Sequence, residues 1–171
     1  YEKTKYESEL LVKKANLNMS VCILRPTNVV SSSRIGILSL PIINGWKEKL
    51  KVHLKGKEVA HIIYAEDVAN AALFFLKNII PKVNIYFVSI DDDDDNTVIS
   101  IYNMYHSMFN KNDRIRLLMP NYVPYILRKI YRGDSLHGRV RFSNEKIKKQ
   151  GFVFEYGVRK SLQEIYKIRG I

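Results

Sequence analysis

Cysteine is nearly absent from this sequence: one residue, Cys22, occurs among 171. A single cysteine excludes an internal disulfide, and a chain without disulfides suits a reducing cytosol, so we expect a cytoplasmic protein. Cys22 lies in the apolar run of residues 21–24, which predicts a buried, inert thiol rather than a nucleophile. Long apolar stretches are also missing. The run at residues 71–76 is far too short to span a bilayer, and we expect no membrane partner.

Acidic residues are few relative to basic ones. Seventeen aspartates and glutamates stand against 28 lysines and arginines, which gives a net charge of +11. Such a charge is compatible with nucleic-acid binding. The lysines are spread along the whole chain, however, with one local cluster at Lys146, Lys148 and Lys149. This distribution is typical of a solvated surface, and it favours an anionic small molecule, such as a nucleotide diphosphate, over a nucleic-acid partner.

The order of apolar patterns predicts an α/β protein. Hydrophobic residues make up 46% of the chain, and 171 residues suffice for one domain with its own core. Helical and strand-like patterns alternate, which indicates a parallel sheet with helical crossovers. The expected helices cover residues 2–16, 35–50 with a break at Pro41 and Gly45, 66–76, 97–109, 122–131, 143–150 and 157–168; the expected strands cover 20–24, 59–64, 85–90 and 140–142.

Five consecutive aspartates occupy residues 91–95. Such a run usually marks a solvated loop, and consecutive carboxylates do not match the alternating ligands of an EF-hand calcium loop. Asn96 or Thr97 is expected to cap the helix that follows, and Ser143 to cap a later one. Gly151 would end that later helix.

The first five residues carry the most informative spacing. Tyr1 and Lys5 stand four apart in a predicted helix and therefore project from the same face. A free tyrosine has a pKa of about 10, and a neighbouring ammonium favours its phenolate, so the pair can exchange a proton nearer neutrality. Oxidising an alcohol to a ketone requires such a base while hydride leaves the carbon. The spacing alone also arises by chance in many helices.

Residues 1–9, YEKTKYESE, resemble the Tyr-x-x-Ser-Lys-x-x-x-Glu signature of the extended short-chain dehydrogenases, the NAD-dependent epimerase/dehydratase family. Thr4 stands where serine is usual, and Glu9 falls on the expected glutamate. Residues 22–30, CILRPTNVV, are similar to the family's Leu-Arg-Pro-x-Asn-Val-Tyr-Gly segment, which ends a central strand beside the nicotinamide. The departures are Val30 for the usual tyrosine and Ser31 for the usual glycine.

Two later segments extend the resemblance. Residues 61–71, HIIYAEDVANA, resemble the family's Val-His-Val-x-Asp-Val-Ala-x-Ala block, in which the aspartate begins and caps a helix. We expect Asp67 to take that role and His61 to be structural. Residues 132–134, followed by 142–152, resemble the family's Arg-Pro-Gly-Asp … Asp-x-x-Lys-x-Leu-Gly-Trp pattern. In sugar-nucleotide members an arginine of that region binds the diphosphate, which suits the planar guanidinium. The candidates for this role are Arg132 and, as rivals, Arg139 and Arg141.

The resemblance implies which residues form the site. Tyr1 would be the acid/base, and Lys5 would lower its pKa and hold the ribose of the cofactor. The implied catalytic residues are Tyr1 and Lys5, the implied cofactor-binding residues are Tyr1, Lys5, Arg25, Pro26 and Thr27, and the implied substrate-binding residues are Asn28 and Arg132, with no metal.

The sequence lacks the family's Gly-x-x-Gly-x-x-Gly loop and the acidic residue that follows it. The catalytic serine or threonine that precedes the tyrosine in relatives is missing as well. We therefore expect a fragment that begins at the catalytic tyrosine. Its intact form would bind NAD or NADP mainly through the missing half, and this chain alone would not bind NAD. The expected domains are the C-terminal part of a Rossmann-like NAD(P)-binding domain at residues 1–30 and 59–90, and a substrate-binding lobe at residues 31–58 and 91–171.

The function that the resemblance implies is that of the C-terminal half of an NAD(P)-dependent nucleotide-sugar epimerase or dehydratase. One alternative is a reductase or hydroxysteroid-type dehydrogenase of the same family, and another is a non-catalytic relative that senses NAD(P). The expected partner is a nucleotide-sugar or similar small molecule, with no nucleic acid. The full-length protein is expected to form a homodimer.

Overall fold

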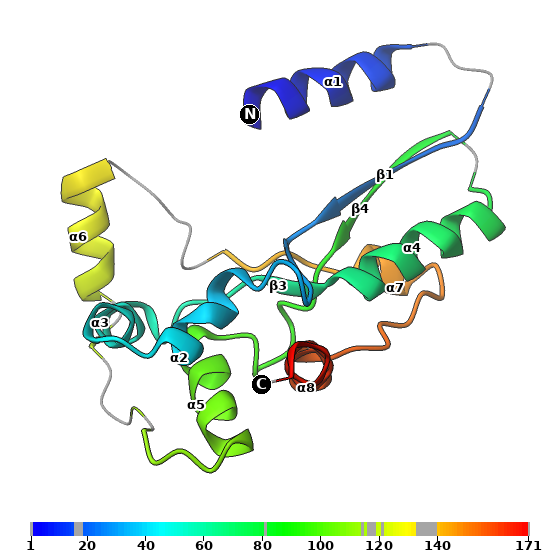
Figure 1. Cartoon of the computed structure of the whole chain (residues 1–171). Coiled ribbons are helices and arrows are strands. Elements are labelled where there is room, and N and C mark those ends of the chain that lie inside the picture. Colours follow the sequence, from blue (N-terminus) through cyan, green and yellow to red (C-terminus); the bar gives the residue numbers. More distant parts are fainter. Residues whose placement is uncertain are drawn as a thin grey trace.

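The computed structural model describes residues 2–15, 19–80, 82–113, 115, 119–120, 122–132 and 140–170. These residues contain eight α-helices and four short strands (Figure 1). The helices are α1 (Glu2–Lys14), α2 (Ser39–Ile43), α3 (Trp46–Lys55), α4 (Ala65–Lys77), α5 (Val98–Met108), α6 (Tyr122–Arg132), α7 (Glu145–Lys148) and α8 (Val158–Arg169), with a 3-10 turn η1 (Gly36–Leu38). The strands are β1 (Val21–Pro26), β2 (Asn28–Val30), β3 (Ile62–Tyr64) and β4 (Val83–Val88).

The strands pair in parallel, which confirms the predicted α/β class. β1 pairs with β4 over six residues, from Val21 opposite Val83 to Pro26 opposite Val88. β2 pairs with β3 over three residues. Parallel strands need a crossover connection, and residues 27–82, which include α4, connect β1 to β4.

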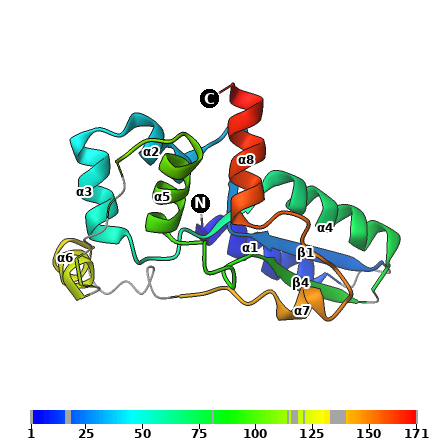
Figure 2. The ribbon, with the colours of Figure 1, turned by 90° about the horizontal axis from the view of Figure 1, so that it is seen from below.

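Helices lie on both sides of the β1–β4 pair. α4 lies on one side and α1 on the other (Figures 1 and 2). The inner face of α4 is apolar: Ala71 is buried, and the ring of Phe75 stacks on Tyr86 of β4 at 4.4 Å between ring centroids. The helix itself was predicted, but from an apolar face that included Ala69 and Ala72, which are exposed; burial of Ala71 and Phe75 fixes α4 on the sheet.

A helical lobe follows, built from η1, α2, α3, α5 and α8 (Figure 2). Tyr105 of α5 packs edge-on against Tyr166 of α8 at 5.1 Å. The hydroxyl of Tyr166 donates to the carbonyl of Leu38 at 3.3 Å. Aromatic side chains thus join segments that lie more than a hundred residues apart.

Several predicted boundaries change in the structure. The helix expected at residues 35–50 is broken as predicted, but Pro41 lies inside α2, and the break comes at Asn44, whose left-handed conformation (φ 51°) ends α2. The strand expected at residues 140–142 is wrong, since this stretch is irregular and pairs with no strand in the described part of the chain. Thr97 caps α5 by accepting from the backbone N–H of Ser100, as predicted. Asn144 stands at the start of α7 without a side-chain cap, whereas the hydroxyl of Ser143 accepts from the backbone N–H of Glu145, the first residue of α7, at 3.3 Å.

The prediction of a solvated loop at residues 91–95 is wrong for Asp91, which is 1% exposed. Its carboxylate accepts from the backbone N–H of Phe142 at 2.9 Å and from Nδ1 of His61 at 2.6 Å. Asp93 accepts from the backbone N–H of Val158, the first residue of α8, at 2.9 Å. The aspartates therefore accept hydrogen bonds from backbone N–H groups of later segments. These acceptors replace the water that the N–H groups lose when the protein folds.

Asp67 also differs from its prediction. Tyr64 precedes α4 without a side-chain cap, and Asp67, which is fully buried, accepts from the backbone N–H groups of Glu155 at 2.9 Å and Tyr156 at 3.2 Å. Burial raises the pKa of Asp67, and those two N–H groups oppose the rise. The residue therefore holds the segment before α8 against α4, and it does not cap the helix.

No helix in the described part of the chain is long and apolar enough to cross a membrane. The same residues contain no group of three or more histidine, cysteine, aspartate or glutamate side chains placed to hold a metal ion.

Candidate active site

Part of the predicted site falls outside the described residues. Tyr1 and Arg139 lie there, together with residues 133–138. Arg132 is the last residue of α6, and its side chain is likewise outside the description. Lys5 lies on α1, exposed on the first half of the helix.

An ion pair between Glu9 and Arg25 holds α1 to β1. The guanidinium of Arg25 donates from Nε at 2.9 Å and from Nη2 at 2.5 Å to one oxygen of Glu9, and Lys13 lies 2.8 Å from the other oxygen. Hydrogen bonds from Lys13 and Arg25 lower the pKa of the Glu9 carboxyl. Arg25 also lies over the ring of Phe87 on β4, 5.5 Å from its centroid. The guanidinium predicted to contact a cofactor thus already has a partner on α1.

The Glu9 contact orients the predicted catalytic face of α1. Residues four apart in a helix share a face, so Lys5 lies one turn before Glu9 on the face of α1 that carries Glu9. α1 runs antiparallel to β1, and its amino end lies on the same side of the molecule as the carboxyl end of β1 (Figure 1). The amino end of α1, which carries Lys5, therefore lies toward the edge of the sheet where ligands bind in α/β proteins.

The residues that follow β1 lie at this edge of the sheet. Pro26 ends the strand, and the hydroxyl of Thr27 is buried without a hydrogen-bond partner in the described part of the chain. The backbone N–H of Asn28 donates to the carbonyl of His61 at 2.7 Å, and its side-chain amide donates to the carbonyl of Ala60 at 3.1 Å. These two bonds fix Asn28 between β1 and β3, where its side chain is exposed.

His61 and Asp91 form a hydrogen bond next to these residues. His61 is a buried non-glycine residue with a positive φ of 55°, a conformation that few side chains adopt without support. The support is the Asp91 carboxylate together with the ring of Phe142, whose centroid lies 5.4 Å from that of the imidazole. The same Phe142 ring lies 5.2 Å from Phe87. Arg141, an exposed residue next to Phe142, is thereby fixed at the carboxyl end of β4.

Sequence reasoning missed the His61–Asp91 pair. A signal existed: Asp91 is the third residue after β4 and therefore lies at the carboxyl edge of the parallel sheet, where polar residues have a function more often than elsewhere. The run of five aspartates made this signal hard to recognise, because the sequence does not distinguish the one buried aspartate from its four neighbours.

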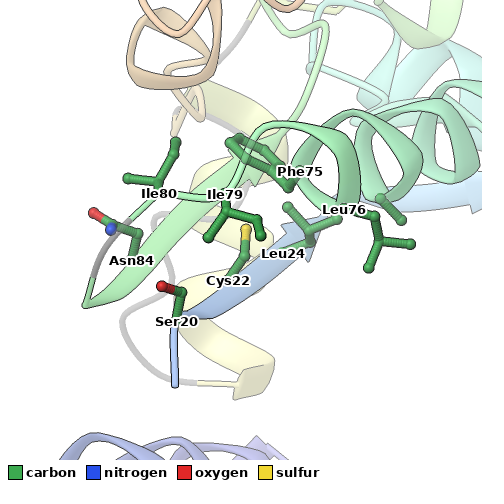
Figure 3. Close-up of a pocket in the computed structure, with 9 residues that line it drawn as sticks. Ser20, Cys22, Leu24, Phe75, Leu76, Ile79, Ile80 and Asn84 are labelled. Atoms are coloured by element: carbon green, nitrogen blue, oxygen red, sulfur yellow. The ribbon is translucent and has the colours of Figure 1, made fainter. Parts of the chain in front are cut away.

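A separate pocket lies on the α4 side of the sheet, with a volume of about 500 Å³ (Figure 3). It is lined by Ser20, Cys22, Leu24, Ala72, Phe75, Leu76, Ile79, Ile80 and Asn84. The prediction of a buried Cys22 is wrong, since the residue is exposed and its sulfur faces this pocket (Figure 3). Partial burial nevertheless raises the pKa of its thiol. None of the predicted site residues lines this pocket.

Comparison with known proteins shows similarity both to a protein family and to solved structures. Residues 1–69 match the NAD-binding family model described as male sterility protein. The fold resembles the crystal structure of UDP-glucose 4-epimerase from Thermus thermophilus in complex with NAD, with a TM-score of 0.53 and 16% sequence identity over 94% of this chain. No curated protein matches the sequence.

The structural similarity confirms the Rossmann-like α/β fold. This chain covers 51% of the epimerase chain and so spans about half its length. The family model covers the segment that contains the Tyr1–Lys5 spacing, β1 and Asn28, and it ends within α4.

Proposed function

We propose that this chain is the C-terminal half of an NAD(P)-dependent enzyme that acts on a hydroxyl of a nucleotide-sugar, as an epimerase or dehydratase. The observation that carries the proposal is the Glu9–Arg25 pair, which holds α1, the helix that carries Lys5, against β1 near the carboxyl end of that strand. The match of residues 1–69 to an NAD-binding family model and the fold similarity to an NAD-complexed epimerase support it.

The residues present fit one end of the cofactor. The buried, unpartnered hydroxyl of Thr27 at the end of β1 suits a polar group of the nicotinamide end. A glycine-rich loop, which would hold the pyrophosphate, is missing from the sequence. Most of the cofactor site therefore belongs to residues beyond this chain.

The proposed chemistry assigns proton transfer to Tyr1. Its phenolate oxygen takes the proton of the sugar hydroxyl as the C–H bond of that carbon breaks and the C–O bond becomes a carbonyl. When bound, NAD or NADP would accept the hydride. The Lys5 ammonium stabilises the phenolate of Tyr1 and holds the cofactor ribose. The resulting ketone is then epimerised or dehydrated, or it is released.

Substrate binding is assigned to Asn28 and Arg132, with Arg141 as a further candidate. Asn28 is the exposed first residue of β2, and two hydrogen bonds hold its position. Arginine suits a diphosphate because its planar guanidinium contacts two phosphate oxygens at once. The net charge of +11 further favours an anionic substrate.

A homodimer that pairs through α1 is part of the proposal. Tyr6 and Leu11 on α1 are both largely exposed, which leaves apolar surface on this helix for a partner.

The test requires the extended polypeptide, by which we mean this chain together with the residues that its gene encodes before Tyr1. The extended polypeptide is mixed with NAD or NADP and with UDP-glucose or other UDP-sugars, and reduction of the nicotinamide and the sugar products are followed. We expect a UDP-sugar to be converted. Conversion of non-nucleotide alcohols or ketones alone would contradict the nucleotide-sugar assignment.

The second candidate is an NAD(P)-dependent reductase or hydroxysteroid-type dehydrogenase with a non-nucleotide substrate. One observation favours it. Val30 occupies the position where the sugar-nucleotide enzymes have tyrosine, and it is 2% exposed, so this position offers no hydroxyl to a sugar. The same substrate panel separates the two candidates.

A further inference from the structure

The backbone around His61 is held in an unusual conformation by the loop of residues 91–96. His61 has a φ of 55°, in the left-handed region that residues other than glycine seldom adopt. On one side of it the backbone N–H of Ala60 donates to the carbonyl of Asn96 at 2.9 Å. On the other side the N–H of Ile62 donates to the side-chain oxygen of Asn96 at 3.2 Å. All four residues are buried, so this one asparagine fixes the backbone on both sides of His61.

The Asp91 carboxylate stabilises the same conformation. It accepts from Nδ1 of His61 at 2.6 Å, and the side-chain amide of Asn96 donates to it at 3.5 Å. A strained backbone persists only where its surroundings determine it, and such positions are concentrated at functional sites. The contacts of the carbonyl groups beside the strained residue indicate what this conformation is for.

The carbonyl groups of His61 and Ala60 both accept hydrogen bonds from Asn28. The His61 carbonyl accepts from the backbone N–H of Asn28 at 2.7 Å, and the Ala60 carbonyl accepts from its Nδ2 at 3.1 Å. Because only the nitrogen of an amide can donate, the second bond decides which way the side chain is turned, and it leaves Oδ1 of Asn28 as an acceptor. No described residue donates to this oxygen, and Asn28 is exposed.

We propose that His61 is a positioning residue whose left-handed backbone turns the amide oxygen of Asn28 toward a hydroxyl of the substrate. The oxygens of a nucleotide diphosphate are hydrogen-bond acceptors, as Oδ1 is, so this atom suits a hydroxyl rather than the diphosphate. The assignment to a substrate hydroxyl rests on the proposed function, in which Asn28 binds substrate. The orientation of Asn28 rests on the hydrogen bonds alone.

Two variants of His61 separate the role of the backbone from that of the side chain. His61→Gly and His61→Ala both remove the imidazole and its bond to Asp91, but only glycine adopts a positive φ without steric cost. In the 171-residue chain we expect His61→Ala to accelerate hydrogen exchange of the Asn28 backbone amide by a factor of about 3–10, as for one lost hydrogen bond. His61→Gly should leave that rate nearly unchanged.

Thr27 provides the internal control. Its backbone N–H donates to the carbonyl of Val88 at 3.2 Å, and its exchange should stay the same in both variants. The two Nδ2 proton resonances of Asn28 report on the side chain, because the bond to Ala60 shifts one of them. We expect that shift to be lost in His61→Ala and kept in His61→Gly. Equal effects of the two variants on Asn28, or equal acceleration at Thr27 and Asn28, overturn the proposal.

The hydroxyl assignment is tested by binding, without turnover. The extended polypeptide is titrated with UDP-glucose and with UDP, which lacks the glucose hydroxyls. We expect Asn28→Ala and His61→Ala each to weaken UDP-glucose binding by a factor of about 3–10 and to leave UDP binding unchanged. His61→Gly should restore the affinity for UDP-glucose that His61→Ala loses.

The outcomes separate this inference from the proposed function. Equal weakening of UDP-glucose and UDP by Asn28→Ala overturns the hydroxyl assignment, because Asn28 would then contact the nucleotide. If the unsubstituted extended polypeptide binds neither ligand, the nucleotide-sugar function is refuted. The exchange rates in the 171-residue chain still decide the role of His61 in that case, since they require no ligand.

Discussion

His106 shows how strongly a single buried residue can link stability to pH. Its side chain on α5 is fully buried, with the ring of Tyr102 at 4.5 Å and that of Tyr105 at 5.4 Å. Neither ring nitrogen has a hydrogen-bond partner in the described part of the chain. Burial lowers the pKa of His106; Asp113 opposes this shift, and the positive charges of Lys111 and Lys49 add to it.

The consequence is a loss of stability in mild acid. A histidine whose pKa is lower in the folded state binds more protons when unfolded, so its contribution is present above about pH 6.5 and is lost as the pH falls toward the folded pKa. The loss cannot exceed about 1.4 kcal/mol per pH unit for one proton. We expect His106→Phe to remove that part of the pH dependence, measured by urea unfolding between pH 7.5 and about pH 5. An identical pH dependence in the variant would contradict this account.

Residue roles were the least predictable part of the structure. Lys5, Arg25 and Asn28 were assigned from a linear motif, which needs only sequence, and their roles remain predictions. Asp67 and Asp91 were assigned wrongly because each accepts from backbone N–H groups that lie 88 and 51 positions away. A sequence shows that a carboxylate is present, but its partner depends on how distant segments come together.

At the scale of elements, the 91–95 loop is the main connection between the sheet and the C-terminal segments. Asp91 holds residue 142, Asp92 accepts from the side chains of Asn144 and Lys148, and Asp93 holds the first turn of α8. Hydrogen bonds from Lys148 and Asn144 lower the pKa of the Asp92 carboxyl against the effect of its partial burial. One short loop therefore positions both α7 and α8.

Asp91→Ala tests this connection. The substitution leaves His61 and the backbone N–H of Phe142 without their shared acceptor, and we expect the free energy of unfolding to fall by about 2–4 kcal/mol. Amide exchange at Phe142 should also accelerate. The matched control is Asp94→Ala, which changes an exposed aspartate of the same loop and should have little effect. Equal destabilisation by both variants would argue against a specific role of Asp91.

The position of α1 depends on Glu9. Because the pKa of Glu9 is lowered in the folded chain, its contribution is present above the ordinary carboxyl pKa of 4.5 and is lost as the pH falls below it. Glu9→Gln should release α1 at neutral pH, and hydrogen exchange of the α1 amides should accelerate while that of α4 stays unchanged. Glu7→Gln is the control, since Glu7 forms only an exposed contact with Lys3 at 3.9 Å. Slow exchange of α1 in Glu9→Gln would show that other contacts hold the helix.

At the scale of the whole molecule, alternating patterns and four motifs predicted the α/β class, the parallel strands and most helices. They could not predict the irregular path of residues 140–144, because an apolar alternation forms a strand only where a neighbouring strand is available. The sequence patterns also gave a wrong prediction of burial for Cys22. An apolar run is buried only if a second layer covers it, and within this chain α4 covers that face of β1 in part.

The cofactor is assigned to the whole enzyme and not to this chain alone. Isothermal titration of NAD into the 171-residue chain should show no binding at micromolar concentrations, since the sequence contains no glycine-rich phosphate loop. The extended polypeptide should bind NAD or NADP in the same experiment. Micromolar binding by the 171-residue chain would contradict this division of the site.

The most direct test of the central claim is the turnover of the extended polypeptide with Tyr1 replaced by phenylalanine. General acid–base catalysis contributes a factor on the order of 10²–10⁴, so we predict a loss of that size with NAD(P) affinity unchanged. Tyr6→Phe, a change to an exposed tyrosine on the same helix, should keep full turnover. Unchanged turnover of Tyr1→Phe would contradict the assignment of Tyr1 as the proton-transfer residue.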